Sequence, residues 1–163
     1  MISILQRVRE ASVTVQAGSF HAEIGRGLCV LLAVEEGDGT EQADWTARKL
    51  AQLRIFPDEQ NKMNRSLEDI RGAVLLVSQI TLVGDTSRGN RPSFAAAAEP
   101  QEGRRLYERV AETLAGRQGL TVRTGIFGAA MIVRVVNDGP VTLIVRTKKR
   151  GSGIGVRGSG SIS

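Results

Sequence analysis

Ser78, Gln79 and Thr81 bring polar side chains into residues 73–83, a stretch otherwise typical of a buried strand. Hydroxyl and amide groups in such a strand need hydrogen-bond partners. Neighbouring strands can supply these partners, and the three residues would then be structural. Alternatively, a bound substrate can supply them. If a protein hydroxyl takes part in a reaction, Thr81 is the best candidate, although a threonine without an adjacent base is a weak nucleophile.

A second stretch, residues 137–142, reads Asn-Asp-Gly-Pro-Val-Thr. A Gly-Pro pair between two strands is usually a simple turn. Because an X-Pro bond can also be cis, Gly139 and Pro140 could instead aim two carbonyl groups in one direction. This stretch by itself does not decide between the two interpretations.

The chain has one cysteine and one histidine, which disfavours several kinds of catalysis. A zinc site needs three or four ligands, so here it would depend on carboxylates, and no such spacing is visible. We therefore expect no metal and no other cofactor. Cys29 lies in an apolar run and is interpreted as a small buried side chain, and His21 as a structural histidine. A Ser-His-Asp or Cys-His enzyme is a poor match.

The net charge of +5 suggests a nucleic-acid partner, but it is distributed unevenly. Residues 148–163 hold four basic residues and no acid, which leaves a net charge of +1 for residues 1–147. We expect a single folded domain over 1–147 and a flexible, basic, Gly/Ser-rich tail over 148–163.

The composition is that of a globular protein in water, with 41% hydrophobic and 24% charged residues. No apolar run approaches the ~20 residues of a membrane span, and the first ten residues do not resemble a signal peptide. The expected location is the cytoplasm, without membrane contacts.

The hydropathy pattern predicts several strands. Alternation over residues 2–8, resumed at 13–15, predicts a β-hairpin. The unbroken apolar run over 28–35 predicts a strand buried on both faces, and 73–83 predicts a central strand. Three further runs, 120–127, 129–136 and 141–147, predict strands, the last two joined by the turn Asn-Asp-Gly-Pro.

Two amphipathic helices accompany these strands. One extends from Thr40 to Leu53, with Asp38 or Thr40 as its N-cap, and Pro100 opens the other. The hairpin-length connections leave no room for repeated βαβ crossovers. The predicted fold class is α+β, with mixed, largely antiparallel, barrel-like β-sheet layers flanked by two main helices.

Several short motifs share one property: in this order they match a known family. They are Gln6-Arg7-Val8, Ala11-Ser12-Val13, Arg54-Ile55-Phe56, Lys62-Met63-Asn64, Ser78-Gln79-Ile80-Thr81-Leu82, Asp85-Thr86, Gly89, Arg91-Pro92-Ser93-Phe94, Thr124-Gly125, Phe127, Met131 and Asn137-Asp138-Gly139-Pro140-Val141-Thr142. Over residues 1–147 the chain therefore resembles the D-aminoacyl-tRNA deacylases.

The resemblance implies hydrolysis of the ester that links a D-amino acid, or mischarged glycine, to the 3′ end of tRNA. It also implies a homodimer with active sites at the subunit interface. The Gly139–Pro140 turn of one subunit, in cis, would enter the pocket of the other and reject L-aminoacyl-tRNA, and Arg7 would orient this turn.

The substrate-binding residues implied by the resemblance are Ser78, Gln79, Ile80, Phe127, Met131, Gly139 and Pro140. The family commonly has an aromatic residue at the position of Ile80. If that ring packs on the terminal adenosine, Ile80 keeps an apolar contact but loses the stacking.

Since His21 and Cys29 are interpreted as structural, neither activates a nucleophile. Water must therefore attack an ester that is already reactive. Backbone N–H groups near Thr81 and the 2′-hydroxyl of the substrate ribose are the expected sources of help. The rival interpretation is a non-catalytic RNA-binding module, with the tail as an electrostatic tether. A small-molecule hydrolase would need a catalytic dyad that we do not find.

Overall fold

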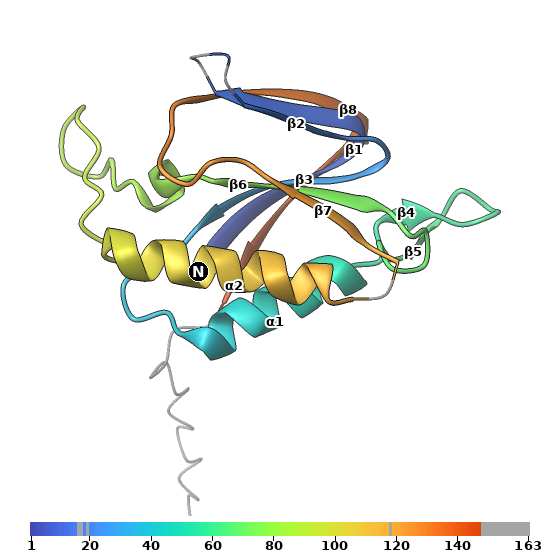
Figure 1. Cartoon of the computed structure of the whole chain (residues 1–163), viewed down its shortest axis with the longest axis horizontal. Helices are drawn as coiled ribbons and strands as arrows, with labels where there is room; N and C mark the ends of the chain where they lie inside the picture. Colours follow the sequence, from blue (N-terminus) through green and yellow to red (C-terminus); the bar gives the residue numbers. More distant parts are fainter. Residues whose placement is uncertain (16–17, 19, 118, 148–163) are drawn as a thin grey trace, which may run out of the picture.

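The computed structural model describes residues 1–15, 18, 20–117 and 119–147, and the predicted tail 148–163 lies outside this part of the chain. A curved sheet carries two helices that lie side by side (Figure 1). In chain order the elements are β1 Ile2–Val15, β2 His21–Ile24, β3 Gly27–Ala33, α1 Thr40–Gln52, β4 Phe56–Pro57, β5 Met63–Arg65, β6 Ala73–Ser78, the 3-10 helix η1 Ile80–Val83, α2 Pro100–Ala115, β7 Thr121–Thr124 and β8 Met131–Arg146.

The main sheet has the strand order β2-β1-β3-β6-β7, and β8 pairs with β1. The pairs of β1 with β2, β3 and β8 are antiparallel, whereas β3–β6 and β6–β7 are parallel. The sheet curls until it is nearly closed into a barrel (Figure 1). The predicted fold class is confirmed: an α+β fold with mixed, largely antiparallel, barrel-like layers and two main helices.

The connections differ from our expectation. The chain passes from β3 to its parallel partner β6 through α1, and from β6 to its parallel partner β7 through α2. Two crossovers of the βαβ kind are therefore present, where none was expected. The connections are long enough because the polar loops around each helix add to its length.

The first strand is longer than its hydropathy predicts. Residues 2–8 and 13–15, expected to be two arms of a hairpin, both belong to β1, whose hairpin partner is β2. The pairing of β1 with β8 shifts register between Gln6 and Val8 and again between Val8 and Glu10. A β-bulge bends a strand without reversing it. The interruption of the alternating pattern after residue 8 therefore indicates bulges within β1 and not a turn.

The predicted strand 73–83 is central, but it ends at Ser78, and residues 80–83 form η1. Its residues Val74–Val77 are buried on both faces. Val74 and Leu76 pack into the core beneath the helices, and Leu75 and Val77 into a second core against β1 and β2. The polar stretch that follows begins where this two-sided burial ends.

The predicted strands 129–136 and 141–147 form the single strand β8, so the turn expected between them does not reverse the chain. Both parts pair with β1. Residues 138–141 lie opposite Arg7 alone, because the neighbours of Arg7 pair with positions 137 and 142. The Asp-Gly-Pro-Val stretch therefore bulges out of a continuous strand.

Both helices lie where the sequence predicts them. Pro100 begins α2 as expected. Thr40 begins α1, but its N-cap is Gly39 and not Asp38 or Thr40. The Asp38 carboxylate instead accepts a hydrogen bond of 2.7 Å from the Glu35 N–H. None of the helices in the described residues has the length and apolar character needed to cross a membrane.

Glu35 lies just after β3 in a buried ionic cluster. Its carboxylate accepts hydrogen bonds from the Met1 ammonium at 2.9 Å and from Arg146 at 2.7 Å. The ammonium also donates to Asp38 at 2.6 Å and to Thr147 at 2.8 Å. Burial by itself raises the pKa of Glu35, but the hydrogen bonds and charges of Arg146 and the ammonium outweigh burial and lower the pKa below its ordinary value.

Glu35→Gln is expected to lower the free energy of unfolding by about 2 kcal/mol at neutral pH, because hydrogen bonds between charged groups are lost. The stabilisation by ionised Glu35 is present above its unfolded pKa of about 4.5 and is lost as the pH falls through the lower folded pKa. Urea unfolding at about pH 7 and about pH 3 checks this. The exposed Glu36, changed to Gln, is the control. A loss that is equal at both pH values would contradict the assignment.

Candidate active site

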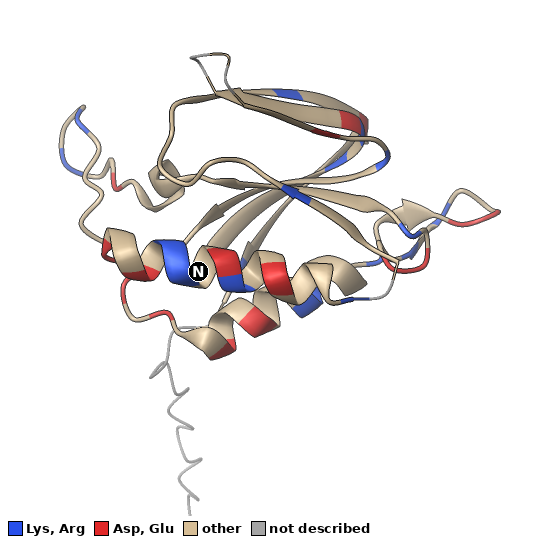
Figure 2. Ribbon diagram, viewed as in Figure 1, with Lys and Arg blue, Asp and Glu red and all other residues tan. Residues whose placement is uncertain are grey.

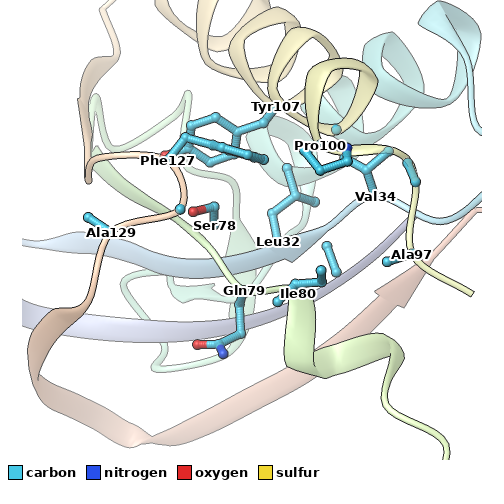
Figure 3. A pocket seen from close by; sticks show the side chains of 14 residues that line it. Leu32, Val34, Ser78, Gln79, Ile80, Ala97, Pro100, Tyr107, Phe127 and Ala129 are labelled. Carbon is cyan, nitrogen blue, oxygen red and sulfur yellow. The ribbon is translucent and has the colours of Figure 1, made fainter. Parts of the chain in front are cut away.

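A pocket of about 360 Å³ opens where β3 and β6 end, beside the first turns of α2 (Figure 3). Most of its lining is apolar, and the exceptions come from the end of β6. The lining consists of residues 32–34, 78–80, 97–98 and 127–129 together with Pro100, Gly103 and Tyr107 of α2. A concave, mostly apolar site with a few polar groups is typical of a ligand pocket.

The end of β6 supplies the polar wall. The Gln79 N–H donates to the Leu32 carbonyl at 2.8 Å, which holds the strand end against β3. Ser78 lies on the pocket side of this wall in Figure 3, while the amide of Gln79 extends away from α2. That amide donates to the hydroxyl of Thr81. Ile80 is 56% exposed and offers apolar surface at the pocket mouth.

Phe127 and Tyr107 form the aromatic side of the pocket. Their ring centroids are 5.6 Å apart, with the rings tilted by 57°. The Tyr107 hydroxyl donates to the Leu76 carbonyl at 2.7 Å, and burial raises the pKa of the phenol well above its ordinary value. Tyr107 is therefore a structural donor. The Arg104 guanidinium lies 5.3 Å from the Phe127 ring centroid, within cation–π range.

The bulge of β8 carries the Gly139–Pro140 peptide bond, which is cis. Arg7 of β1 holds it in place: its Nε donates to the Asp138 carbonyl at 2.9 Å and its Nη1 to the Ile55 carbonyl at 2.6 Å. Gly139 has a φ of +135°, and a Cβ atom there would lie 2.8 Å from Nη2 of Arg7. Only glycine fits this position.

The structure brings some of the predicted site residues together and leaves others apart. Those that line the pocket are Ser78, Gln79, Ile80 and Phe127. Thr81 is exposed beside it on η1. Met131 lies outside the pocket and packs against the second core. Gly139 and Pro140 are exposed outside it, and Arg7 lies behind them. A pocket within one chain therefore does not contain the Gly-Pro turn.

Sequence reasoning missed the wall made by α2. The sequence predicts Pro100 only as the start of the second helix, and its pattern does not distinguish Tyr107 from the other apolar residues of that helix. Gly103 was the available signal, since a glycine on the buried face of a helix leaves room beside it. A Cβ atom on Gly103 would lie 3.5 Å from the Phe127 ring.

The single thiol and the single imidazole lie outside the pocket. Cys29 is 2% exposed within β3, and burial raises its pKa to about 11, so the thiol stays protonated at neutral pH. The ring nitrogens of His21, on β2, lie 3.2 Å from the side chains of Thr14 on β1 and Glu23 on β2. Neither can activate water in the pocket.

The exposed side of β8 carries several large apolar residues. Ile144 is 69% exposed, Ile132 48% and Val136 45%. They lie on the strand that also presents the Gly139–Pro140 turn. A row of apolar side chains on a sheet face is typical of a protein–protein contact surface.

Comparison with known proteins agrees with the fold and the motifs. The family model described as D-Tyr-tRNA(Tyr) deacylase matches residues 4–146. A protein of Chlorobaculum tepidum named D-aminoacyl-tRNA deacylase is 49% identical over 150 residues, which cover 92% of this chain and 99% of that protein. A protein of the same name from Cereibacter sphaeroides is 54% identical over 143 residues, 88% of this chain and 97% of its own.

Two solved structures share the architecture. One, named c-Myc DNA Unwinding Element Binding Protein, has a TM-score of 0.84 and 37% identity, covering 91% of this chain and 99% of its own. The other, described as a probable eukaryotic D-amino acid tRNA deacylase, has a TM-score of 0.73 at 19% identity and covers 88% of this chain and 97% of its own, and it shows the fold alone. The chain is a member of the D-aminoacyl-tRNA deacylase family of enzymes.

Proposed function

We propose that this protein hydrolyses the ester bond of D-aminoacyl-tRNA and of mischarged glycyl-tRNA, releasing free tRNA and the amino acid. The observation that carries the proposal is the pocket in which Ser78, Gln79 and Ile80 meet Phe127, within a chain of this family. A cytoplasmic location follows from this function, because translation consumes aminoacyl-tRNA there.

The pocket suits the terminal aminoacyl-adenosine. Its apolar lining favours the flat base, and Phe127 offers an aromatic ring for stacking. Ile80 at the mouth contributes apolar contact without a ring face. Ser78 and Gln79 supply the hydrogen-bonding groups that orient the ester.

The Gly139–Pro140 turn acts in the pocket of a second copy. It is exposed and absent from the pocket of its own chain. The apolar row on β8 flanks it, so a homodimer formed through this face would carry the turn of each subunit toward the partner. There the backbone carbonyls would occupy the space into which an L side chain projects, while D side chains and glycine are accepted. Met131, also expected to bind substrate, begins β8, the strand that carries the turn.

The chemical step uses water. Cys29 is buried and protonated, and His21 lies on another part of the sheet, so no imidazole or thiolate of the described residues serves as base. Backbone N–H groups at the start of η1, near Thr81, stabilise the negative charge on the ester oxygen. The 2′-hydroxyl of the terminal ribose assists the attack. The protein mainly orients and polarises an ester that is already reactive.

Incubation with D-Tyr-tRNA and Gly-tRNA, following the loss of the ester, tests this function. Turnover of many equivalents per protein chain is expected. Tight binding of the tRNA without ester loss would identify the protein as a non-catalytic RNA-binding module and would overturn the proposal.

Thr81→Ala is expected to keep activity within about tenfold of the native protein, because water and not the threonine hydroxyl attacks the ester. Single-turnover rates with D-Tyr-tRNA measure this. The matched substrate change is a tRNA ending in 2′-deoxyadenosine, which should react much more slowly. Loss of nearly all turnover in Thr81→Ala, with equal rates for the two tRNAs, would instead make Thr81 the nucleophile.

A further inference from the structure

The loop between η1 and α2 ends in a tip that the chemistry above does not use. We call residues 86–92, Thr-Ser-Arg-Gly-Asn-Arg-Pro, the basic tip. It contains Arg88 and Arg91 and no acid, and all of its residues are exposed. Figure 2 shows blue segments at the outer end of this loop, beyond the body of the fold.

The base of the loop is well held. Asp85 and Ser93 exchange backbone hydrogen bonds of 2.8 and 2.9 Å, which close the loop below the tip. The Asp85 carboxylate accepts the Ser87 N–H at 2.8 Å, and this backbone hydrogen bond lowers the pKa of Asp85. Asp85 therefore stays ionised at neutral pH and orders the loop below the tip, and its single negative charge is outweighed by Arg88 and Arg91.

Both ends of this loop run into the pocket lining. It leaves from η1, which begins with Ile80, and it returns at Ala97 and Ala98. Ala98 is fixed by a hydrogen bond of 3.0 Å from its N–H to the Val34 carbonyl. The basic tip is therefore joined at both ends to the wall of the pocket and projects outward from it (Figure 2).

We propose that the basic tip binds the phosphate backbone of the substrate tRNA near its 3′ end, while the pocket holds the terminal aminoacyl-adenosine. This inference rests on the proposed function. A guanidinium forms paired hydrogen bonds with phosphate oxygens, and the hydroxyls of Thr86 and Ser87 and the amide of Asn90 are further donors of the kind that contact phosphates. Such contacts are independent of sequence, so they add affinity for tRNA without choosing the amino acid.

The test compares Arg88→Gln/Arg91→Gln with Arg48→Gln/Lys49→Gln, which removes the same charge from exposed positions of α1, away from the pocket lining. Binding of uncharged tRNA is measured between about 50 and 200 mM salt. The tip variant should bind roughly tenfold or more weakly at ~100 mM salt, and its slope of log K against log salt should shrink by ~1 to 2, at ~0.7 to 0.9 per phosphate contact. The α1 variant should match the native protein.

Turnover supplies the second readout. At saturating D-Tyr-tRNA the tip variant should keep the native kcat, and with free D-Tyr-adenosine, which lacks the phosphates, both kcat and KM should be unchanged. An unchanged salt slope, or the same loss in the α1 variant, would overturn the inference. So would a tip variant that sediments as a smaller species than the native protein, because the tip would then belong to a contact between subunits. If the native protein binds tRNA without cleaving it, the proposed function fails while the role of the tip still stands.

Discussion

D-Tyr-tRNA is expected to be cleaved at least about a thousandfold more efficiently than L-Tyr-tRNA, measured as kcat/KM. A pocket that merely fits one side chain better discriminates by only ~10 to 200-fold. A thousandfold ratio corresponds to about 4 kcal/mol, which requires repulsion of the L side chain. The backbone carbonyls of the Gly139–Pro140 turn, which Arg7 fixes through the Asp138 carbonyl, can supply this repulsion because they do not move aside. Comparable cleavage of D-Tyr-tRNA and L-Tyr-tRNA would contradict the proposal that the turn excludes L side chains.

Arg7→Lys should reduce this discrimination by about tenfold or more, because lysine cannot hold the Asp138 and Ile55 carbonyls together. The control is Arg9→Lys, since Arg9 is exposed and contacts the side-chain carboxylate of Asp138, at 3.3 Å. Thermal unfolding of both variants separates a folding defect from a specific effect. Equal D/L ratios in native protein and Arg7→Lys, with the fold intact, would show that Arg7 does not position the turn.

The second large effect is expected from Val136→Glu/Ile144→Glu. In the proposed homodimer these exposed apolar residues of β8 become buried, and two carboxylates per subunit would be costly to bury without partners. The variant should sediment as a folded monomer and lose at least about a hundredfold in activity, since each site would lack the partner's turn. Met63→Glu, at a residue that is 55% exposed on β5, should leave assembly and activity unchanged. An active monomer would contradict the shared site.

The two helices and the central strand could be predicted from local patterns. The apolar stripe of α2 and its start at Pro100 need only the sequence around them. The two-sided burial of β6 likewise follows from an unbroken apolar run. These patterns report which side of an element is buried, and that was sufficient for the fold class.

The bulges were not predictable in the same way. Whether a polar break is a turn or a bulge depends on the partner strand, and β8 is more than a hundred residues from β1 in the chain. Gly139 and Pro140 therefore appeared to be a reversal, although they project from a continuous strand. The wall of the pocket made by α2 depends on packing between Gly103 and Phe127, and the local sequence shows the glycine but not the residue that packs against it.

The long strand β1 connects two parts of the molecule that act in different places. Arg7, at the middle of β1, donates a hydrogen bond to the turn. The first half of β1 pairs with β3, and the end of β3 forms a wall of the pocket. In the proposed dimer the linkage runs in a circle, from one pocket through β3 and β1 to the turn, then into the other pocket and back. One strand, β1, therefore positions a wall of its own pocket through β3 and, through Arg7, the turn that enters the partner's pocket.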